Sequence, residues 1–152
     1  MSNLYSISEV AQILGMPAST IRYYDNQGLL SGLSRSNGGA RVFTDDDIER
    51  LRVVERLKAS NMPLREIKRY LDLSAQGDAS IEERRKIVHE RKKEIEKQMD
   101  KLQVAHDFIV YKCWFYDTAS EAGTCDVPRE MSDDEMPPEM AEIKSRCMVN
   151  KF

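Results

Sequence analysis

A long stretch without glycine or proline, residues 81–122, limits what this 152-residue chain can fold into. Within it, apolar residues recur at every seventh position, which is typical of a helix that pairs with another helix in a coiled coil. The repeated positions are Ile81, Val88, Ile95, Leu102 and Ile109. The second seam position of each heptad is polar at first and more apolar from Met99 onward. Because so narrow an apolar stripe on so long a helix finds no cover within a small domain, the sequence predicts a homodimer formed through this helix.

The start of this helix is predicted at Ser80, because a serine followed three residues later by Glu83 has the spacing of a capping box. Just upstream, the small and turn-forming residues 74–78 interrupt the helical pattern and predict a hinge. The long helix and the residues before the hinge are therefore expected to be separate parts of the chain.

Two short helices joined by a tight turn are predicted near the N-terminus. The first begins at Ser6, which forms a capping-box pattern with Glu9, and its apolar residues repeat with the period of an amphipathic helix. Gly15 can take the left-handed conformation that ends a helix, Pro17 favours the start of the next one, and Gly28 ends it. Helix, tight turn and helix are the order of a helix-turn-helix motif.

The second of these helices has a polar face that suits DNA. Ile21 and the pair Leu29-Leu30 are expected to point inward, which leaves polar side chains for the outer face. An arginine can contact a guanine edge or a phosphate, and hydroxyl groups bond phosphate oxygens. The polar residues are Ser19, Thr20, Arg22 and Tyr23. We therefore interpret this segment as a DNA-recognition helix, although an ordinary amphipathic surface helix has the same pattern.

Residues 31–43 are too rich in turn formers for a helix and predict a two-stranded hairpin centred on Asn37-Gly38-Gly39. Arg35 and Arg41 stand on its two arms and could grip a phosphate backbone, as the wing of a winged helix does. A surface loop with two solvated arginines is the alternative. Two further helices are then predicted, one capped by Thr44 and one beginning at Pro63.

Composition narrows the function classes. The formal net charge is −3, but the excess of acid lies in residues 113–152, so a local basic patch for DNA remains possible. The three cysteines are an odd number and suit reduced thiols better than a disulfide framework. The chain has no 18-residue apolar run and no signal-peptide pattern, so we expect a cytoplasmic protein without a membrane partner. No enzyme motif is found, and no cofactor is expected.

The order of these elements resembles the MerR family of bacterial transcription regulators over residues 5–112. The motifs that carry the resemblance are Ile7 with Val10-Ala11, Gly15, Thr20-Ile21-Arg22-Tyr23-Tyr24, Gly28-Leu29-Leu30, Arg35, Gly39 with Arg41, Asp47-Ile48 with Leu51, and Leu64 with Glu66-Ile67. The resemblance implies a mostly α fold in four parts: a winged helix-turn-helix DNA-binding domain (1–75), a hinge (76–79), a dimerisation helix forming an antiparallel coiled coil (80–112) and an effector-binding tail (113–152).

The resemblance also implies a mechanism and a set of contacts. Such regulators bind double-stranded promoter DNA as homodimers, untwist the spacer between the promoter hexamers when activated, and thereby act on RNA polymerase indirectly. The DNA-binding residues are then expected to be Ser19, Thr20, Arg22, Tyr23, Tyr24, Arg35 and Arg41. A coiled-coil scaffold that does not bind DNA is the alternative, and it has no need of Arg22 or the wing arginines.

The resemblance to the family is weaker in the tail, residues 113–152. Aromatic residues gather near the predicted end of the dimer helix, and we expect a small organic inducer, neutral or cationic, to bind there. The expected effector-binding residues are Tyr111, Cys113, Trp114, Phe115 and Tyr116. Alternatively these aromatics only seal the end of the coiled coil, or Cys113 and Cys125 sense an electrophile or a monovalent metal. A last helix is predicted over residues 138–147, with Met140, Ile143 and Cys147 facing inward.

No resident metal site is expected. Ser80 stands where the family's divalent-metal sensors have a cysteine, which weakens a zinc, mercury or lead assignment. The three cysteines are also far apart in the sequence, whereas a metal cluster needs ligands packed together.

Overall fold

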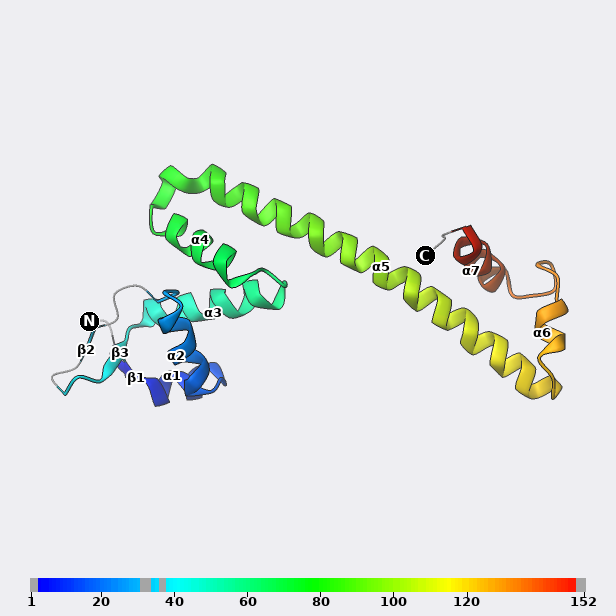
Figure 1. Ribbon diagram of the computed structural model, residues 1–152, viewed down its shortest axis with the longest axis horizontal. Helices are drawn as coiled ribbons and strands as arrows, with labels where there is room; N and C mark the ends of the chain where they lie inside the picture. The colour runs from blue at the N-terminus through cyan, green and yellow to red at the C-terminus, as the bar shows by residue number, and fades with distance from the viewer. Residues whose placement is uncertain (1–2, 31–33, 36–37, 150–152) are drawn as a thin grey trace. The chain divides into compact units, whose positions relative to one another are not determined.

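The computed structural model describes residues 3–30, 34–35 and 38–149, which are mostly helical (Figure 1). The chain divides into two compact units, Met1–Lys92 and Lys93–Phe152, which we describe separately. The order of elements is β1 (Tyr5–Ser6), α1 (Ile7–Leu14), α2 (Ala18–Asn26), β2 (Ser34–Arg35), β3 (Arg41–Phe43), α3 (Asp45–Ala59), α4 (Leu64–Ser74), η1 (Gly77–Ser80), α5 (Ile81–Ala122), α6 (Asp126–Glu130) and α7 (Pro138–Val149).

The helix-turn-helix predicted from the sequence is formed by α1 and α2. The capping box at the start of α1 is confirmed, because the backbone amide of Ser6 donates to Glu9 at 2.7 Å and the amide of Glu9 donates to the Ser6 hydroxyl at 3.3 Å. Gly15 has φ 63°, the left-handed conformation that ends α1. Pro17 is the N-cap of α2, one residue before the first helical position. Gly15 and Pro17 therefore set the turn between α1 and α2 and the direction in which α2 starts.

The wing is part of a three-stranded antiparallel sheet with the order β1-β3-β2. Its predicted arms pair with Arg35 opposite Arg41, and Tyr5 pairs with Phe43 on the other edge of β3. The sequence did not predict β1, because two residues are too few to show an alternating pattern. The predicted hairpin centre includes Asn37, which lies outside the described residues.

One hydrophobic core joins the elements of the first unit. Helices α3 and α4 pack together, and the core also takes residues from α1, α2 and β3 (Figure 1). Its buried residues are Val10, Ile21, Tyr24, Leu29, Leu30, Phe43, Ile48, Leu51, Val54, Met62, Ile67 and Leu71. Thr44 caps α3 as predicted, and Asn61 takes the left-handed conformation after it, with φ 59°. The wing strand and the recognition helix are thus held by the same core.

The connection between α4 and α5 differs from the predicted hinge. Residues 77–80 form the short helix η1, and the side chain of Ser80 is buried. Its hydroxyl donates to the carbonyl oxygens of Leu73 and Gly77 and accepts a hydrogen bond from Arg84 at 3.0 Å. The capping box predicted for Ser80 and Glu83 is therefore wrong, because the serine hydroxyl bonds to the Leu73 and Gly77 carbonyls and the Arg84 side chain rather than to the Glu83 amide.

Helix α5 begins where it was predicted to begin but extends beyond residue 112 to Ala122, a length of roughly 63 Å for its 42 residues. It ends before Gly123, which has φ 73°. Its first turns belong to the first unit: Arg91 pairs with Glu66 at 3.1 Å and donates to the carbonyl of Asn61 at 3.3 Å. The boundary between the units therefore lies inside α5, not at the predicted position before it.

The second unit has a small core of its own. Met136, Met140 and Ile143 are buried, and side chains of α5 pack against them, as does the partly buried Cys147. The predicted last helix and its inward residues are confirmed by α7. The short helix α6 was not predicted, because it is only five residues long and contains Pro128. Proline is instead accommodated near the start of a helix, where no amide hydrogen bond is lost.

Candidate nucleic-acid interface

The outer face of α2 is polar and exposed, as the sequence predicted. Ile21 and Tyr24 are buried and hold the helix on the core. Ser19 and Arg22 are exposed, Thr20 is half-buried, and the ring of Tyr23 is 47% exposed. The arrangement presents a guanidinium group and hydroxyl groups together on one surface. These are the groups that contact phosphates and base edges in protein–DNA complexes.

Tyr24 does not belong to this surface, which corrects its expected role in DNA contact. Its side chain is fully buried, and its hydroxyl donates to Glu55 at 2.5 Å and accepts from the Lys58 ammonium at 3.0 Å. Tyr24 therefore fastens α2 to α3. The sequence carried a signal for this, because Tyr24 follows Ile21 by three residues and so lies on the same inward face.

The environment changes the acid–base behaviour of this pair. Burial, and then the hydrogen bond to Glu55, raises the pKa of the Tyr24 hydroxyl. The hydrogen bond with Tyr24 is the main cause that raises the pKa of Lys58. Both shifts favour a neutral phenol and a charged ammonium near neutral pH.

The side chain of Arg41, which was expected to contact DNA from the wing, is held by an ion pair within the chain. Its Nε atom lies 2.5 Å from the carboxylate of Asp25 near the end of α2. This ion pair connects the wing strand β3 to the recognition helix, so the two elements keep a fixed relation. Arg35 pairs with Arg41 through the backbone, and its side chain lies outside what the structure describes.

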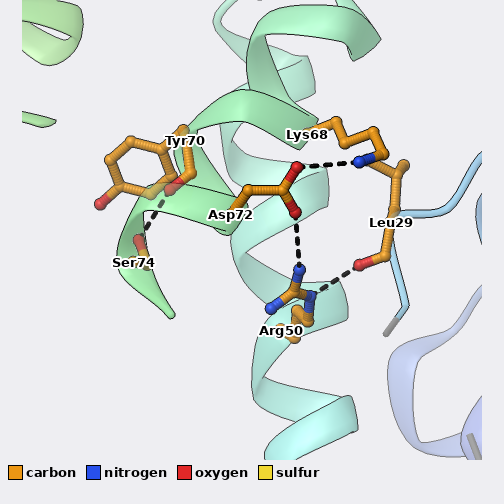
Figure 2. Close-up of polar contacts among 6 residues, drawn as sticks. All are labelled: Leu29, Arg50, Lys68, Tyr70, Asp72 and Ser74. Atoms are coloured by element: carbon orange, nitrogen blue, oxygen red, sulfur yellow. Dashed lines mark hydrogen bonds and ion pairs between the residues drawn. The ribbon is translucent and has the colours of Figure 1, made fainter. Parts of the chain in front are cut away.

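A polar chain fastens the other side of the motif (Figure 2). The Nε of Arg50 donates to the carbonyl of Leu29 at 2.6 Å, just after α2. Another nitrogen of Arg50 lies 4.0 Å from Asp72, which also accepts from Lys68 at 2.8 Å. This chain joins α2, α3 and α4. It was not predicted, because its members are far apart in the sequence.

The expected effector residues divide between two faces of α5. Tyr111 and Trp114 pack on the second unit's core, with their ring centroids 5.7 Å apart. Tyr116 is 59% exposed and follows Ile109 by seven residues, so it continues the apolar seam, and Cys113 is exposed too. Phe115 lies between the groups, with centroids 6.5 Å from Tyr111 and 5.3 Å from Tyr116. The structure therefore does not gather all five residues in one place.

Cys113 also differs from its expected environment. The dimer helix was predicted to end at residue 112, just before Cys113, but α5 continues to Ala122, so Cys113 lies within the helix. All three cysteines are free thiols. Within residues 3–30, 34–35 and 38–149, no group of three or more His, Cys, Asp or Glu side chains could hold a metal ion. No helix in the same ranges is long and apolar enough to cross a bilayer.

Comparison with known proteins identifies related chains. A model described as "MerR HTH family regulatory protein" matches residues 5–74, and one described as "MerR, DNA binding" matches residues 48–110. An uncharacterized HTH-type transcriptional regulator of Haemophilus influenzae is 35% identical over 120 residues, which are 79% of this chain and 89% of that protein. The transcriptional regulator ZntR of Escherichia coli K12 is 30% identical over 101 residues, 66% of this chain and 72% of ZntR.

A solved structure supports the same relationship to MerR regulators. HiNmlR, described as a MerR family regulator lacking the sensor domain and bound to promoter DNA, is 33% identical to this chain. The match has a TM-score of 0.70 and covers 83% of this chain and 96% of HiNmlR. Fold and surface together define a winged helix-turn-helix DNA-binding transcriptional regulator. The chain belongs to the MerR family.

The first prediction concerns the exposed arginine of α2. Arg22→Ala should weaken specific operator binding by about 1–3 kcal/mol, because a guanidinium contact to a base edge or phosphate is lost. Titration of labelled operator DNA would measure it, and sedimentation should show an unchanged oligomer. Equal affinity of the variant and the parent would remove Arg22 from the recognition surface.

The second prediction concerns the buried hydroxyl. Tyr24→Phe should lower the free energy of unfolding by about 1 kcal/mol at pH 7. Because the folded-state pKa of Tyr24 is raised, this contribution is full below the unfolded value of about 10 and is lost as the pH rises above it. Denaturant unfolding at pH 8 and 11 should therefore show a smaller difference at the higher pH. Tyr23→Phe, at the exposed neighbour, is the control and should change neither value.

Proposed function

We propose that this chain is an effector-responsive homodimer that regulates transcription by distorting promoter spacer DNA. The observation that carries the proposal is the exposed Ser19, Arg22 and Tyr23 face on a helix held to α3 and the wing by separate polar contacts. Rigid attachment suits a reading helix, because base contacts require a fixed position relative to the phosphates. The promoter DNA bound to the related HiNmlR supports the same partner.

Dimerisation is proposed from the heptad seam of α5. Met99, Leu102 and Ile109 are 63%, 71% and 57% exposed, and Ile81 and Val88 are also exposed. The inward residues of α7 pack on Tyr111 and Trp114, so the second unit's core leaves Leu102 and Ile109 uncovered. Ile95, the remaining residue of the repeat, is half-buried. A second copy of the same helix supplies a matching stripe, which favours a symmetric pair. The antiparallel orientation is proposed from the family alone.

The third prediction tests this seam. Leu102→Asp or Ile95→Asp should produce a monomer at micromolar concentration, because a charge would be buried in the interface. Operator affinity should fall when the dimer is lost, since two linked recognition helices bind more tightly than one. Lys101→Asp adds the same side chain beside the seam and should leave the dimer intact. A parent protein that sediments as a stable monomer would end the proposal.

The proposed mechanism is the one implied by the family, and it requires two recognition helices held at a fixed separation. A dimer that fits DNA only when the spacer is untwisted stabilises the distorted form, and the distortion costs energy that depends on spacer sequence and length. RNA polymerase would then respond to the realigned promoter hexamers rather than to a contact with this protein. No catalytic chemistry is required, and we propose that the chain is not an enzyme.

The fourth prediction concerns the spacer. Footprinting should place the dimer between the two promoter hexamers, and shortening the spacer to the usual length should make transcription independent of the protein. The reason is that realignment is then already present in the DNA. A footprint outside the spacer, or regulation that persists on the shortened promoter, would argue against distortion.

For the effector we propose a small organic molecule, neutral or cationic, that binds beside Tyr111 and Trp114. Aromatic rings and the methionines packed near them provide an adaptable apolar surface, and methionine adjusts to different shapes. The surplus of carboxylates in the tail disfavours an anion. Cys113 is exposed, so an electrophile or a monovalent metal acting on Cys113 and Cys125 is the second candidate.

The fifth prediction separates these candidates. Trp114→Ala should abolish the response of a reporter promoter to organic inducers while operator binding is kept. Cys113→Ser combined with Cys125→Ser should leave that response largely intact. The two variants are to be assayed against neutral and cationic aromatic compounds, an electrophile and monovalent copper. A response that needs the cysteines and not the tryptophan would assign the protein to thiol or metal sensing.

A further inference from the structure

The first unit contains a cavity of about 540 Å³ between the beginning of α3, the end of α4 and the wing strand β3. This volume is within the range of small-molecule binding sites, which is about 300–1,000 Å³. The cavity belongs to the DNA-binding unit and is separate from the aromatic residues of the second unit. Its walls are formed by residues of β3, α3 and α4 and by Thr44 just before α3.

One side of the cavity is apolar and aromatic. Val42, Val53 and Leu71 contribute aliphatic side chains, and Tyr70 contributes a half-buried ring. Figure 2 shows the Tyr70 ring directed away from the chain of contacts formed by Leu29, Arg50 and Asp72. The Tyr70 hydroxyl has no hydrogen-bond partner among the residues that the structure describes, whereas the nearby Ser74 hydroxyl donates to the Tyr70 carbonyl at 2.9 Å. The ring thus offers both an aromatic face and an unused polar group.

The other side is acidic. Asp47 is engaged in capping α3, where it accepts from the Thr44 amide at 2.8 Å, and Glu49 pairs with Arg52. The exposed Asp46 has no polar partner within the described part of the chain. Arg50, the cation of the lining, is already committed to the Leu29 carbonyl and faces Asp72. Because Arg50 is engaged and the Asp46 carboxylate is left unpaired, the lining favours a positively charged ligand over an anion.

From this combination we propose that the cavity binds a small organic cation, an ammonium group carried on an apolar or aromatic body. The ammonium group would lie near Asp46, and the body would lie against Tyr70, Val53 and Val42. A cation near an aromatic face and a carboxylate is a recurrent way to bind amines.

The cavity lies where a bound ligand would change the affinity of the protein for DNA. Val42 belongs to β3, the central strand of the wing sheet, and Arg50 bonds the carbonyl that follows the recognition helix. A ligand in this cavity therefore contacts residues directly connected to both DNA-reading elements. This site goes beyond the effector site proposed for the second unit, and it acts without α7 or the tail.

The experiment uses the full chain and three probes that share a phenyl group: 2-phenylethylammonium, 2-phenylethanol and 3-phenylpropanoate. Amide NMR shifts recorded on the full chain should change at Val42, Thr44, Asp46 and Ser74 as the cation is added. The alcohol should bind more weakly than the cation, and the anion should bind weakest. No operator DNA is present, so a failure here leaves the proposed DNA-binding function standing.

Variants identify the groups involved. Asp46→Asn should weaken binding of the cation about threefold, as expected for one exposed charge pair, and leave the alcohol unchanged. Tyr70→Leu should weaken both. Asp78→Asn removes an exposed carboxylate outside the cavity and should change neither. Equal binding of all three probes, shifts confined to residues 110–116, or no shift at millimolar cation would overturn the proposal.

Discussion

The arrangement of the DNA-binding unit depends on one buried contact, the hydroxyl of Tyr24 between Glu55 and Lys58. A short helix is not stable alone, so α2 takes its position from whatever it packs against. The apolar core holds α2 in place, but nondirectional packing allows a helix to rotate about its axis. A directional hydrogen bond from a buried side chain limits that rotation and so selects which residues of α2 face outward.

The other polar contacts of this unit extend the same constraint. Asp25 to Arg41 connects α2 with the wing, and Leu29 to Arg50 connects the segment after α2 with α3. Each of these contacts joins residues from different elements, so the recognition surface is assembled by tertiary structure. The free energy involved in each is modest, because partly exposed ion pairs contribute little to stability. We infer that their main effect is on geometry.

Sequence patterns predicted what local chemistry controls. The capping box at Ser6, the left-handed Gly15 and the hairpin arms followed from short-range spacing, and the family followed from the motifs that carry the resemblance. Tertiary contacts explain the differences. Tyr24 and Tyr23 were both predicted to contact DNA, but packing against the core buries Tyr24 and leaves Tyr23 exposed. Ser80 has the spacing of a capping box, but its hydroxyl bonds backward to the Leu73 carbonyl. The DNA contacts and the effector site remain predictions.

The attachment of Arg91 to Glu66 and Asn61 has a consequence for how the molecule can be divided. The first three turns of α5 are part of the fold of the DNA-binding unit, and Ile87 packs on its core. A fragment ending at residue 75 would lose this support and would leave apolar surface of α4 in water. We infer that the smallest fragment that keeps this unit folded extends to about residue 92, and that the heptads beyond that point can be changed without altering its fold.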